Sequence, residues 1–504
     1  MSIPRFDHLI DGAIVAPHSG RYLPVHNPAT GEVIAEVACG DAADADLAVA
    51  AAQRAFDNPA WRDMTPAARS ALLSKFIDVI KHNAQELVYL ESISSGGTVS
   101  RIANLDLLMS IDSIMTMADI VHSYPFTSSL AQKPIPELTD VKIIKEAIGV
   151  CVLIPAWNMP LLLFINKMLP ALAAGNTVVV KPSELTPHTA TRLAQLLSPL
   201  LPPGVLNVVN GIGTEIGEAL TLHPGVSKVS FTGSTAVGKR IVANSAATLK
   251  RVTLELGGKG AAIVTADADL DAVAQGALFG VMLNAGQACE SGTRLLVHAS
   301  ICDALLERMA KLANGLTVGN PLDPRTSVGP MCHAAHGAKV LEHIESAIAE
   351  GARLVCGGRR VTVAGCEGGF FVAPTILADC HNRMQAVRDE IFGPVLAVIP
   401  YTDIEQAIAI ANDSDYGLSA GIWTGDVLAA QPIARRLRAG SVWINDWHML
   451  RTDVPFGGYK QSGQGREMGI YGLESYLETK AISTAFQRAP EKKTMTYGIV
   501  HKQA

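Results

Sequence analysis

The feature that most constrains the fold is an alternation of short apolar segments with longer amphipathic ones, which begins near residue 149. Strands that are apolar on both faces, separated by amphipathic helices, are typical of a parallel sheet covered on both sides. The first series of such segments comprises GVCVLIPA (149–156), NTVVVKP (176–182), VLNVVNG (205–211), KVSFTGS (228–234) and RVTLELGG (251–258).

A second series of the same kind starts at residue 261. Its strand-like segments are AAIV (261–264), RLLVH (294–298), PVLAVIPYTD (394–403), GIWTGD (421–426) and SVWIND (441–446). Two successive α/β units predict two domains, and a cleft between two domains is a common place for a binding site. The fold class we predict is therefore α/β with more than one domain.

The flanks of these units have a different character. Residues 41–95 and 100–122 read as helices that could pack on the first sheet, and 126–147 read as a small projecting hairpin. The polar tail that begins at Arg488 is expected to be loosely held.

Composition excludes several classes of function. A formal charge of −6 without a dense basic run argues against nucleic acid as a partner. The eight cysteines are dispersed, with no CxxC pair and no HExxH motif, which predicts reduced thiols and no metal site. The N-terminus does not resemble a signal peptide, and the most apolar run is too short and too interrupted to span a bilayer. We therefore expect a cytoplasmic protein without a membrane partner.

Two motifs in the first unit are candidates for binding a dinucleotide. GIGTEIG (211–217) is not a true GxGxxG, and glycines that merely open a helix explain it better. In FTGSTAVG (231–238) a helix opens directly after a strand, so its free N–H groups and Ser234 could hold a pyrophosphate. Lys181 and Glu184 follow a strand at the edge where sheet ligands bind, although a solvated charge pair is an equal alternative.

The segment NAGQACESGTR (284–294) contains the candidate nucleophile, Cys289. A single cysteine is more often a buried inert thiol, but this one lies on a Gly/Gln loop after a helix. A free cysteine is only a few per cent thiolate at neutral pH, so it needs a depressed pKa or a nearby base. Glu255, at the end of the first unit, could face Cys289 across the cleft.

A rival motif is Gly417-Leu-Ser-Ala-Gly421, which matches the GxSxG elbow of serine hydrolases. That elbow needs a strand before the serine and a helix after it. Here a helix and a turn precede the motif and a strand-like segment follows, so the context argues against a hydrolase.

Taken together, the motifs PAWNMP, VVVKPSE, FTGSTAVG, LELGGK, GQAC, EIFGPV and PFGGYKQSG resemble, in their order and spacing, the NAD(P)-dependent aldehyde dehydrogenase superfamily. The resemblance runs from HNPATGEVIAEV (26–37) to PFGGYKQSGQGREMG (455–469). It implies an aldehyde-dehydrogenase-like fold: a Rossmann-type cofactor domain, an α/β catalytic domain and a small β oligomerisation element, hence a homodimer or homotetramer. The implied boundaries are 1–125 with 148–255 for the NAD-binding domain, 256–457 for the catalytic domain, 126–147 with 476–490 for the oligomerisation element, and 491–504 for the tail.

The resemblance also implies the roles of individual residues. Cys289 would be the nucleophile, Glu255 the general base and Asn158 an oxyanion donor, with no metal. Glu184 would favour NAD over NADP. The implied cofactor-binding residues are Ile154, Trp157, Lys181, Ser183, Glu184, Gly213, Phe231, Gly233, Ser234, Val237, Leu256, Gly257, Glu390 and Phe392.

These roles imply NAD-dependent oxidation of an aldehyde to its acid through a thiohemiacetal and a thioester on Cys289. Glu255 would activate the water that hydrolyses the thioester, which favours hydrolysis over transfer to coenzyme A. A non-catalytic binding or structural protein on the same fold is an alternative, but the joint presence of Cys289, Glu255 and Asn158 argues against it.

The sequence departs from the family along the expected substrate channel, for which we predict Met159, Leu162, Asn166, Glu290, Leu450, Arg451 and Phe456. Fewer aromatic walls are expected, and a hydrophobic aldehyde (aromatic, terpenoid or aliphatic) is favoured. The alternative is a semialdehyde whose carboxylate meets Arg451, unless Arg451 pairs with Glu290 or Asp453. Because a carboxylate close to a thiol raises the thiol pKa, we expect the Glu290 side chain to point away from Cys289.

Overall fold

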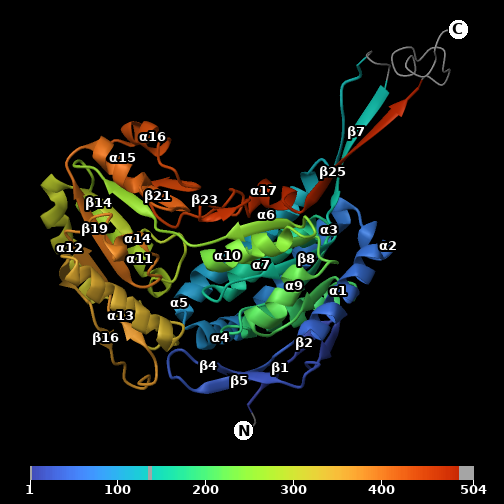
Figure 1. Ribbon diagram of the computed structural model, residues 1–504, viewed down its shortest axis with the longest axis horizontal. Helices are drawn as coiled ribbons and strands as arrows, with labels where there is room; N and C mark the ends of the chain where they lie inside the picture. The colour runs from blue at the N-terminus through green and yellow to red at the C-terminus, as the bar shows by residue number, and fades with distance from the viewer. Residues whose placement is uncertain (1–2, 134–138, 487–504) are drawn as a thin grey trace.

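The computed structural model describes residues 3–133 and 139–486 (Figure 1). The first series of apolar segments forms the centre of an eight-stranded sheet with the order β24-β12-β11-β8-β9-β10-β2-β3. Its five central strands are parallel: β8 (Val150–Ile154), β9 (Thr177–Val180), β10 (Leu206–Val208), β11 (Lys228–Thr232) and β12 (Arg251–Glu255). Antiparallel strands complete it: β2 (His8–Ile10), β3 (Ala13–Val15) and β24 (Gly463–Gln464).

Both faces of this sheet are covered, as the apolar strands predict. In β8, Cys151 and Leu153 pack into one core, whereas Val150 and Val152 pack into another. Successive residues of a strand point to opposite faces, so each strand serves both cores. The first core includes helices α3 (Pro66–His82), α6 (Leu107–Ser123), α7 (Pro160–Ala173) and α8 (His188–Leu197). The second includes α1 (Ala42–Asp57), α9 (Glu218–Leu222) and α10 (Thr235–Ser245).

The expected helices before residue 123 are present. Besides α1, α3 and α6 they comprise α2 (Pro59–Arg62), α4 (Ala84–Ser95), α5 (Val99–Arg101) and a π-helical turn, η1 (Ile102–Asp106). Helix α7 begins at Pro160, where a missing N–H costs nothing, and the chain leaves it through Gly175 at a φ of 93°.

The second series of apolar segments forms a seven-stranded sheet with the order β15-β18-β19-β14-β13-β21-β22. Its strands are β13 (Ala261–Val264), β14 (Arg294–His298), β15 (Arg353–Cys356), β18 (Thr375–Ala378), β19 (Val395–Tyr401), β21 (Ser419–Trp423) and β22 (Ser441–Ile444). All pairs are parallel except β15 with β18. Its helices are α11 (Leu270–Met282), α12 (Cys302–Gly315), α13 (Ala334–Ala349), α14 (Gln385–Arg388), α15 (Ile404–Asn412) and α16 (Val427–Ala434).

A small sheet of order β25-β7-β6 projects from the body as an arm (Figure 1). It contains β6 (Thr127–Ser129), β7 (Thr139–Ala147) and β25 (Leu477–Ala485), and both strand pairs are antiparallel. The strands of the expected hairpin are therefore present, and β25, within the implied element 476–490, pairs with β7. The predicted tail, 491–504, lies outside the described residues.

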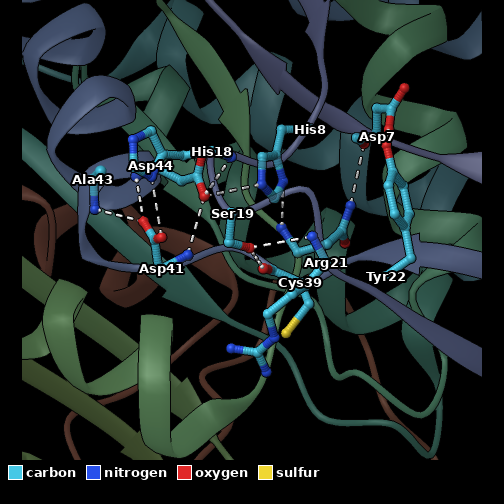
Figure 2. A network of polar contacts seen from close by, with 11 residues as sticks. Asp7, His8, His18, Ser19, Arg21, Tyr22, Cys39, Asp41, Ala43 and Asp44 are labelled. Atoms are coloured by element: carbon cyan, nitrogen blue, oxygen red, sulfur yellow. Dashed lines mark hydrogen bonds and ion pairs between the residues drawn. The ribbon is translucent and has the colours of Figure 1, made fainter.

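Near the N-terminus a polar network joins β2 to the first turn of α1 (Figure 2). The Asp44 carboxylate accepts hydrogen bonds from the backbone N–H groups of Asp41 and His18, both at 3.0 Å, and lies 3.6 Å from His8 Nε2. His8 Nδ1 accepts from the N–H of Asn210 at 3.1 Å. Asn210 leads into the loop 211–213, so the network helps to hold the loop that borders a cavity described below.

The remaining short elements complete the chain. They are β1 (Arg5–Phe6), β4 (Tyr22–His26), β5 (Val33–Ala38), η2 (Ser198–Leu200), η3 (Gly213–Gly217), η4 (Leu283–Gly286), η5 (Ala299–Ile301), β16 (Arg360–Val361), β17 (Phe371–Val372), β20 (Tyr416–Gly417), β23 (Tyr459–Lys460) and α17 (Gly469–Glu474).

Candidate active site

A cavity of about 270 Å³ lies where the ends of both large sheets meet. Asn158 reaches it from the turn after β8, Glu255 from the last residue of β12, and Cys289 from the loop after η4. Glu390 and Phe392 enter from the turn after α14. The carboxyl ends of parallel strands are the usual position of ligand sites in open α/β sheets.

The loop that carries Cys289 is held in an uncommon backbone conformation. Asn284 and Ala285 have a φ of 53° and Gly286 has a φ of 74°. A Cβ on Gly286 would lie 2.0 Å from the carbonyl oxygen of Gly393, so only glycine fits there. The Gln287 side chain accepts a hydrogen bond from the N–H of Cys332 at 2.9 Å. The thiol is therefore presented by a tightly packed turn.

Asn158 faces this loop. Its Nδ2 donates to the carbonyl oxygen of Gln287 at 3.0 Å, and Asn284 Nδ2 donates to the carbonyl oxygen of Asn158 at 2.8 Å. These two bonds hold the amide donor of Asn158 close to the cysteine, where a developing oxyanion could be stabilised.

Glu255 is 2% exposed, and neither of its carboxylate oxygens has a hydrogen-bond partner among the described residues. Burial, followed by the charge of Glu467, raises its pKa well above the ordinary value. A carboxyl group with a raised pKa is suited to exchange protons with water near neutral pH.

Glu467, which we did not predict, lines the polar side of the cavity, and Lys167 is its buried partner behind the lining. Lys167 is fully buried on α7 and its Nζ lies 2.5 Å from Glu467 Oε1, which also accepts from Ser230 Oγ at 3.1 Å. A lysine in the otherwise apolar helix 160–173 was the available signal, because a buried lysine needs a partner.

A second cavity of about 270 Å³ adjoins the end of β9. Lys181 Nζ lies 2.7 Å from Glu184 Oε2, and both side chains line this cavity. Burial alone would raise the pKa of Glu184, but Lys181 outweighs it and the pKa is lowered, so the carboxylate is charged. Gly213 is open here, because the nearest atom to an added Cβ, Lys181 Nζ, is 3.9 Å away. These features suit the hydroxyls of an adenosine ribose.

Most of the predicted cofactor residues line one cavity or the other. Ile154, Lys181, Glu184, Gly213, Phe231 and Val237 line the second cavity, and Trp157, Gly233, Ser234, Leu256, Gly257, Glu390 and Phe392 line the first. Ser234 lines the first cavity and caps α10 by accepting from the N–H of Val237 at 3.4 Å, so the N-terminus of this helix lies beside the cavity, where a pyrophosphate could bind. Ser183 lines neither cavity, and its Oγ accepts from the N–H of Leu185.

The nicotinamide end is expected at Glu390 and Phe392. Glu390 Oε1 accepts from the N–H of Gly258 at 2.7 Å, and burial raises the pKa of Glu390 to about 7. Trp157 and Phe392 pack edge to face with ring centroids 5.3 Å apart. A dinucleotide cofactor therefore fits the residues that are present, from the second cavity into the first.

The predicted substrate channel is largely apolar. Met159, Leu162, Asn166, Leu450 and Phe456 all line the first cavity, and Asn166 Oδ1 accepts from Ser113 Oγ at 2.9 Å. In contrast, the structure places Arg451 outside the cavity. Its guanidinium binds Asp453 at 2.6 Å, and its side chain is 68% exposed.

The prediction that the Glu290 side chain points away from Cys289 is wrong. Its Oε2 accepts from Cys289 Sγ at 3.2 Å, and its Oε1 lies 2.9 Å from His448 Nδ1. The physical reason is the buried His448, whose Nδ1 holds the carboxylate at this position. Burial, then the charge of Glu290, raises the pKa of Cys289 well above its ordinary value.

The structure also removes the serine-hydrolase alternative. Ser419 begins strand β21 and is buried, and its Oγ donates to the carbonyl oxygen of Glu290 at 2.8 Å. A serine inside a strand, with its hydroxyl engaged in this way, is not a nucleophile elbow. In residues 3–133 and 139–486, no group of three or more His, Cys, Asp or Glu side chains could hold a metal ion. Within the same residues no helix combines the length and apolar character that crossing a membrane requires.

Comparisons with known proteins agree with this geometry. The family model of the aldehyde dehydrogenase family matches residues 14–482. Betaine aldehyde dehydrogenase of Bacillus subtilis is 40% identical over 482 residues, which cover 94% of this chain and 96% of the relative.

Solved structures are similar over the same length. Indole-3-acetaldehyde dehydrogenase AldA of P. syringae, a mutant in complex with NAD⁺ and IAA, has a TM-score of 0.93 and 39% identity, covering 96% of this chain and 97% of that one. An NAD⁺ complex of aldehyde dehydrogenase from Bacillus cereus has a TM-score of 0.92 and 38% identity, with the same coverage of 96% and 97%.

Proposed function

The chain belongs to the aldehyde dehydrogenase family, and we propose that it oxidises an aldehyde to the carboxylic acid with NAD, using Cys289 as the nucleophile. The observation that carries this proposal is the single cavity lined by Cys289, Glu255, Asn158, Glu390 and Phe392. It brings a thiol, an oxyanion donor and a base together with the residues expected at the nicotinamide.

The first chemical step is addition of the Cys289 sulfur to the aldehyde carbon. The carbonyl oxygen becomes an oxyanion, which the Asn158 amide and the N–H of Cys289 stabilise. One such donor is typically worth about 10²- to 10³-fold in rate.

NAD⁺, when bound, supplies the hydride acceptor that turns this thiohemiacetal into a thioester. Lys181 and Glu184 would hold its adenosine ribose, the α10 N-terminus its pyrophosphate, and Glu390 its nicotinamide ribose. The charged Glu184 would repel a phosphate on that ribose, which favours NAD over NADP.

Hydrolysis of the thioester completes the reaction. Glu255, once it has lost its proton, accepts one from a water that attacks the acyl carbon, and the acid leaves as the sulfur is released. A general base of this kind contributes roughly 10²- to 10⁴-fold. Its presence supports hydrolysis as the fate of the thioester.

A hydrophobic aldehyde is the substrate class that the cavity favours. Met159, Leu162, Leu450 and Phe456 supply apolar walls, and in the described part of the chain no lysine or arginine is among the residues lining this cavity. The semialdehyde alternative depended on Arg451, which binds Asp453 instead.

We further propose that the protein works as a cytoplasmic homo-oligomer. Most of β25 is exposed on the projecting arm, as a strand that packs on a second subunit would be (Figure 1). Light scattering coupled to size-exclusion chromatography tests this: a monomer would contradict it.

The deciding experiment is NADH formation over a panel of aliphatic, aromatic, terpenoid and carboxylated aldehydes, with Cys289→Ala as the control. We expect turnover with apolar members and none in the variant. If the wild-type protein binds NAD⁺ but forms no NADH with any member, the proposal fails and a binding protein on this fold becomes the better hypothesis.

A further inference from the structure

The carboxylate of Glu290 connects the nucleophile to a histidine. Oε2 lies 3.2 Å from Cys289 Sγ and Oε1 lies 2.9 Å from His448 Nδ1. Glu290 is 5% exposed and His448 9% exposed. Because an ionised carboxylate only accepts hydrogen bonds, the thiol must donate to Oε2 and Nδ1 must carry a proton.

This arrangement is fixed from several directions. The carbonyl oxygen of Glu290 accepts from Ser419 Oγ at 2.8 Å and from Trp447 Nε1 at 3.0 Å. The His448 ring packs edge to face with Phe279 on α11, at a centroid distance of 5.3 Å. Strand β21, helix α11 and the loop after β22 therefore all contribute to holding the carboxylate at the sulfur.

Glu255, the other carboxyl group to which we assign a proton transfer, is not bonded to the thiol. No hydrogen bond joins Glu255 to Cys289 among the described residues, and burial keeps the Glu255 pKa high. Burial would also raise the pKa of Glu290, but the hydrogen bond and charge of His448 outweigh it, and the pKa is lowered. Glu290 is therefore the charged acceptor that already touches the thiol.

We propose that Glu290 takes the proton of the Cys289 thiol as the sulfur adds to the aldehyde, with His448 as the residue that positions its carboxylate. This inference rests on the proposed function. The S–H bond breaks and an O–H bond forms on Glu290 Oε2, while the sulfur lone pair makes the S–C bond. The carbonyl π electrons become the oxyanion.

The same proton returns at the end of the cycle. When the hydrolysing water has added to the thioester and the C–S bond breaks, the departing sulfur takes the proton back from Glu290. The proton of the water passes to Glu255 and then to solvent. Glu290 therefore leaves the cycle unchanged, and the overall reaction stays balanced with Glu255 serving the second half and Glu290 the first.

This role predicts a contrast that a structural role would not produce. In Glu290→Gln the proton acceptor beside the sulfur is absent, so alkylation of Cys289 by iodoacetamide, which needs the same deprotonation, should be slower at neutral pH. The burst of NADH in the first turnover should fall with it by about 100-fold, the low end for loss of a general base, and both should recover towards high pH, where the thiol ionises without a base. Cys289→Ala gives the alkylation background, and Glu405→Gln, the same change at an exposed carboxylate, is the control.

A second pair of variants tests the positioning residue. His448→Ala removes the donor to Glu290, so the Glu290 pKa would rise. The acid limb of the pH dependence of the NADH burst should therefore move to higher pH. His448→Asn, which keeps a side-chain N–H in this position, should restore most of the burst. NAD⁺ titration of each variant verifies that the site is folded.

Three results would overturn the inference. A burst in Glu290→Gln that is unchanged or faster would make Glu290 only an obstacle to thiolate formation. A loss of alkylation and burst that does not recover at high pH would make it only structural. If the wild-type protein forms no NADH from any aldehyde, both this inference and the proposed function fail, whereas either of the first two results leaves the proposed function intact.

Discussion

Lys167 and Glu467 form a buried ion pair, with Nζ 2.5 Å from Oε1, and Glu467 lines the same cavity as Glu255. After burial itself, the charge of Glu467 is the main reason that the pKa of Glu255 is raised. The pair thus connects a lysine in the first core to the proposed base for hydrolysis.

Glu467→Gln should shift the acid limb of thioester hydrolysis to lower pH. Without the Glu467 charge the Glu255 pKa falls, so Glu255 loses its proton, and can act as a base, at a lower pH. The rate of acyl-enzyme decay after a single turnover, measured as a function of pH, checks this. An unshifted limb would mean that Glu467 does not influence the base.

Lys167→Met should lower stability rather than only activity. It leaves Glu467 buried without its cation, which typically costs about 3 to 5 kcal/mol of unfolding free energy. Urea unfolding compared with the double variant Lys167→Met/Glu467→Gln tests the cause, because removing both charges should recover much of the loss. Equal losses in the single and double variants would assign the cost to packing.

Asn158→Ala should lower the first-turnover NADH burst by roughly 10²-fold while leaving NAD⁺ affinity close to that of the wild-type protein. The reason is loss of the Nδ2 donor that the Gln287 carbonyl now holds beside the cysteine. A burst reduced less than about threefold would show that the backbone N–H of Cys289 suffices.

Glu184→Gln should weaken the preference for NAD over NADP. The charged carboxylate beside Lys181 would repel a ribose phosphate, and its loss leaves Lys181 free to attract one. We expect the ratio of kcat/KM for the two cofactors to fall about tenfold, equivalent to ~1.4 kcal/mol. An unchanged ratio would place the discrimination elsewhere.

His188 predicts a pH dependence of stability. Burial lowers its pKa to about 4 from an ordinary 6.5, so the unfolded chain binds the proton more tightly than the folded one. The unfolding free energy should therefore be highest above about pH 6.5, where His188 is neutral in both states. It should fall as the pH drops towards 4, at up to ~1.4 kcal/mol per pH unit. His188→Met should show a correspondingly shallower fall in unfolding free energy between pH 7 and pH 5, whereas parallel curves would contradict the assignment.

Much of the fold followed from local sequence. Segments such as VCVLI (150–154), apolar at every position, could only be strands buried on both faces, and the cores on either side of β8 confirm it. Pro160 and Gly175 bracket α7. The domain boundaries, including the division near residue 256, stay a prediction, because the strand pattern indicates how many sheets form and not where their packing units end.

The sequence by itself therefore determined the class of the protein, the order of its strands and helices, and the residues Cys289, Glu255 and Asn158 that meet in one cavity. Only the tertiary structure decided how charges pair inside that cavity. We expected the Glu290 side chain to point away from Cys289, because a carboxylate close to a thiol raises the thiol pKa. Whether this effect keeps the two groups apart depends on which other groups are buried with them. His448, distant in sequence, supplies that partner, as Glu467 does for Lys167. Pairing of buried charges depends on distances between remote segments, which no local pattern encodes.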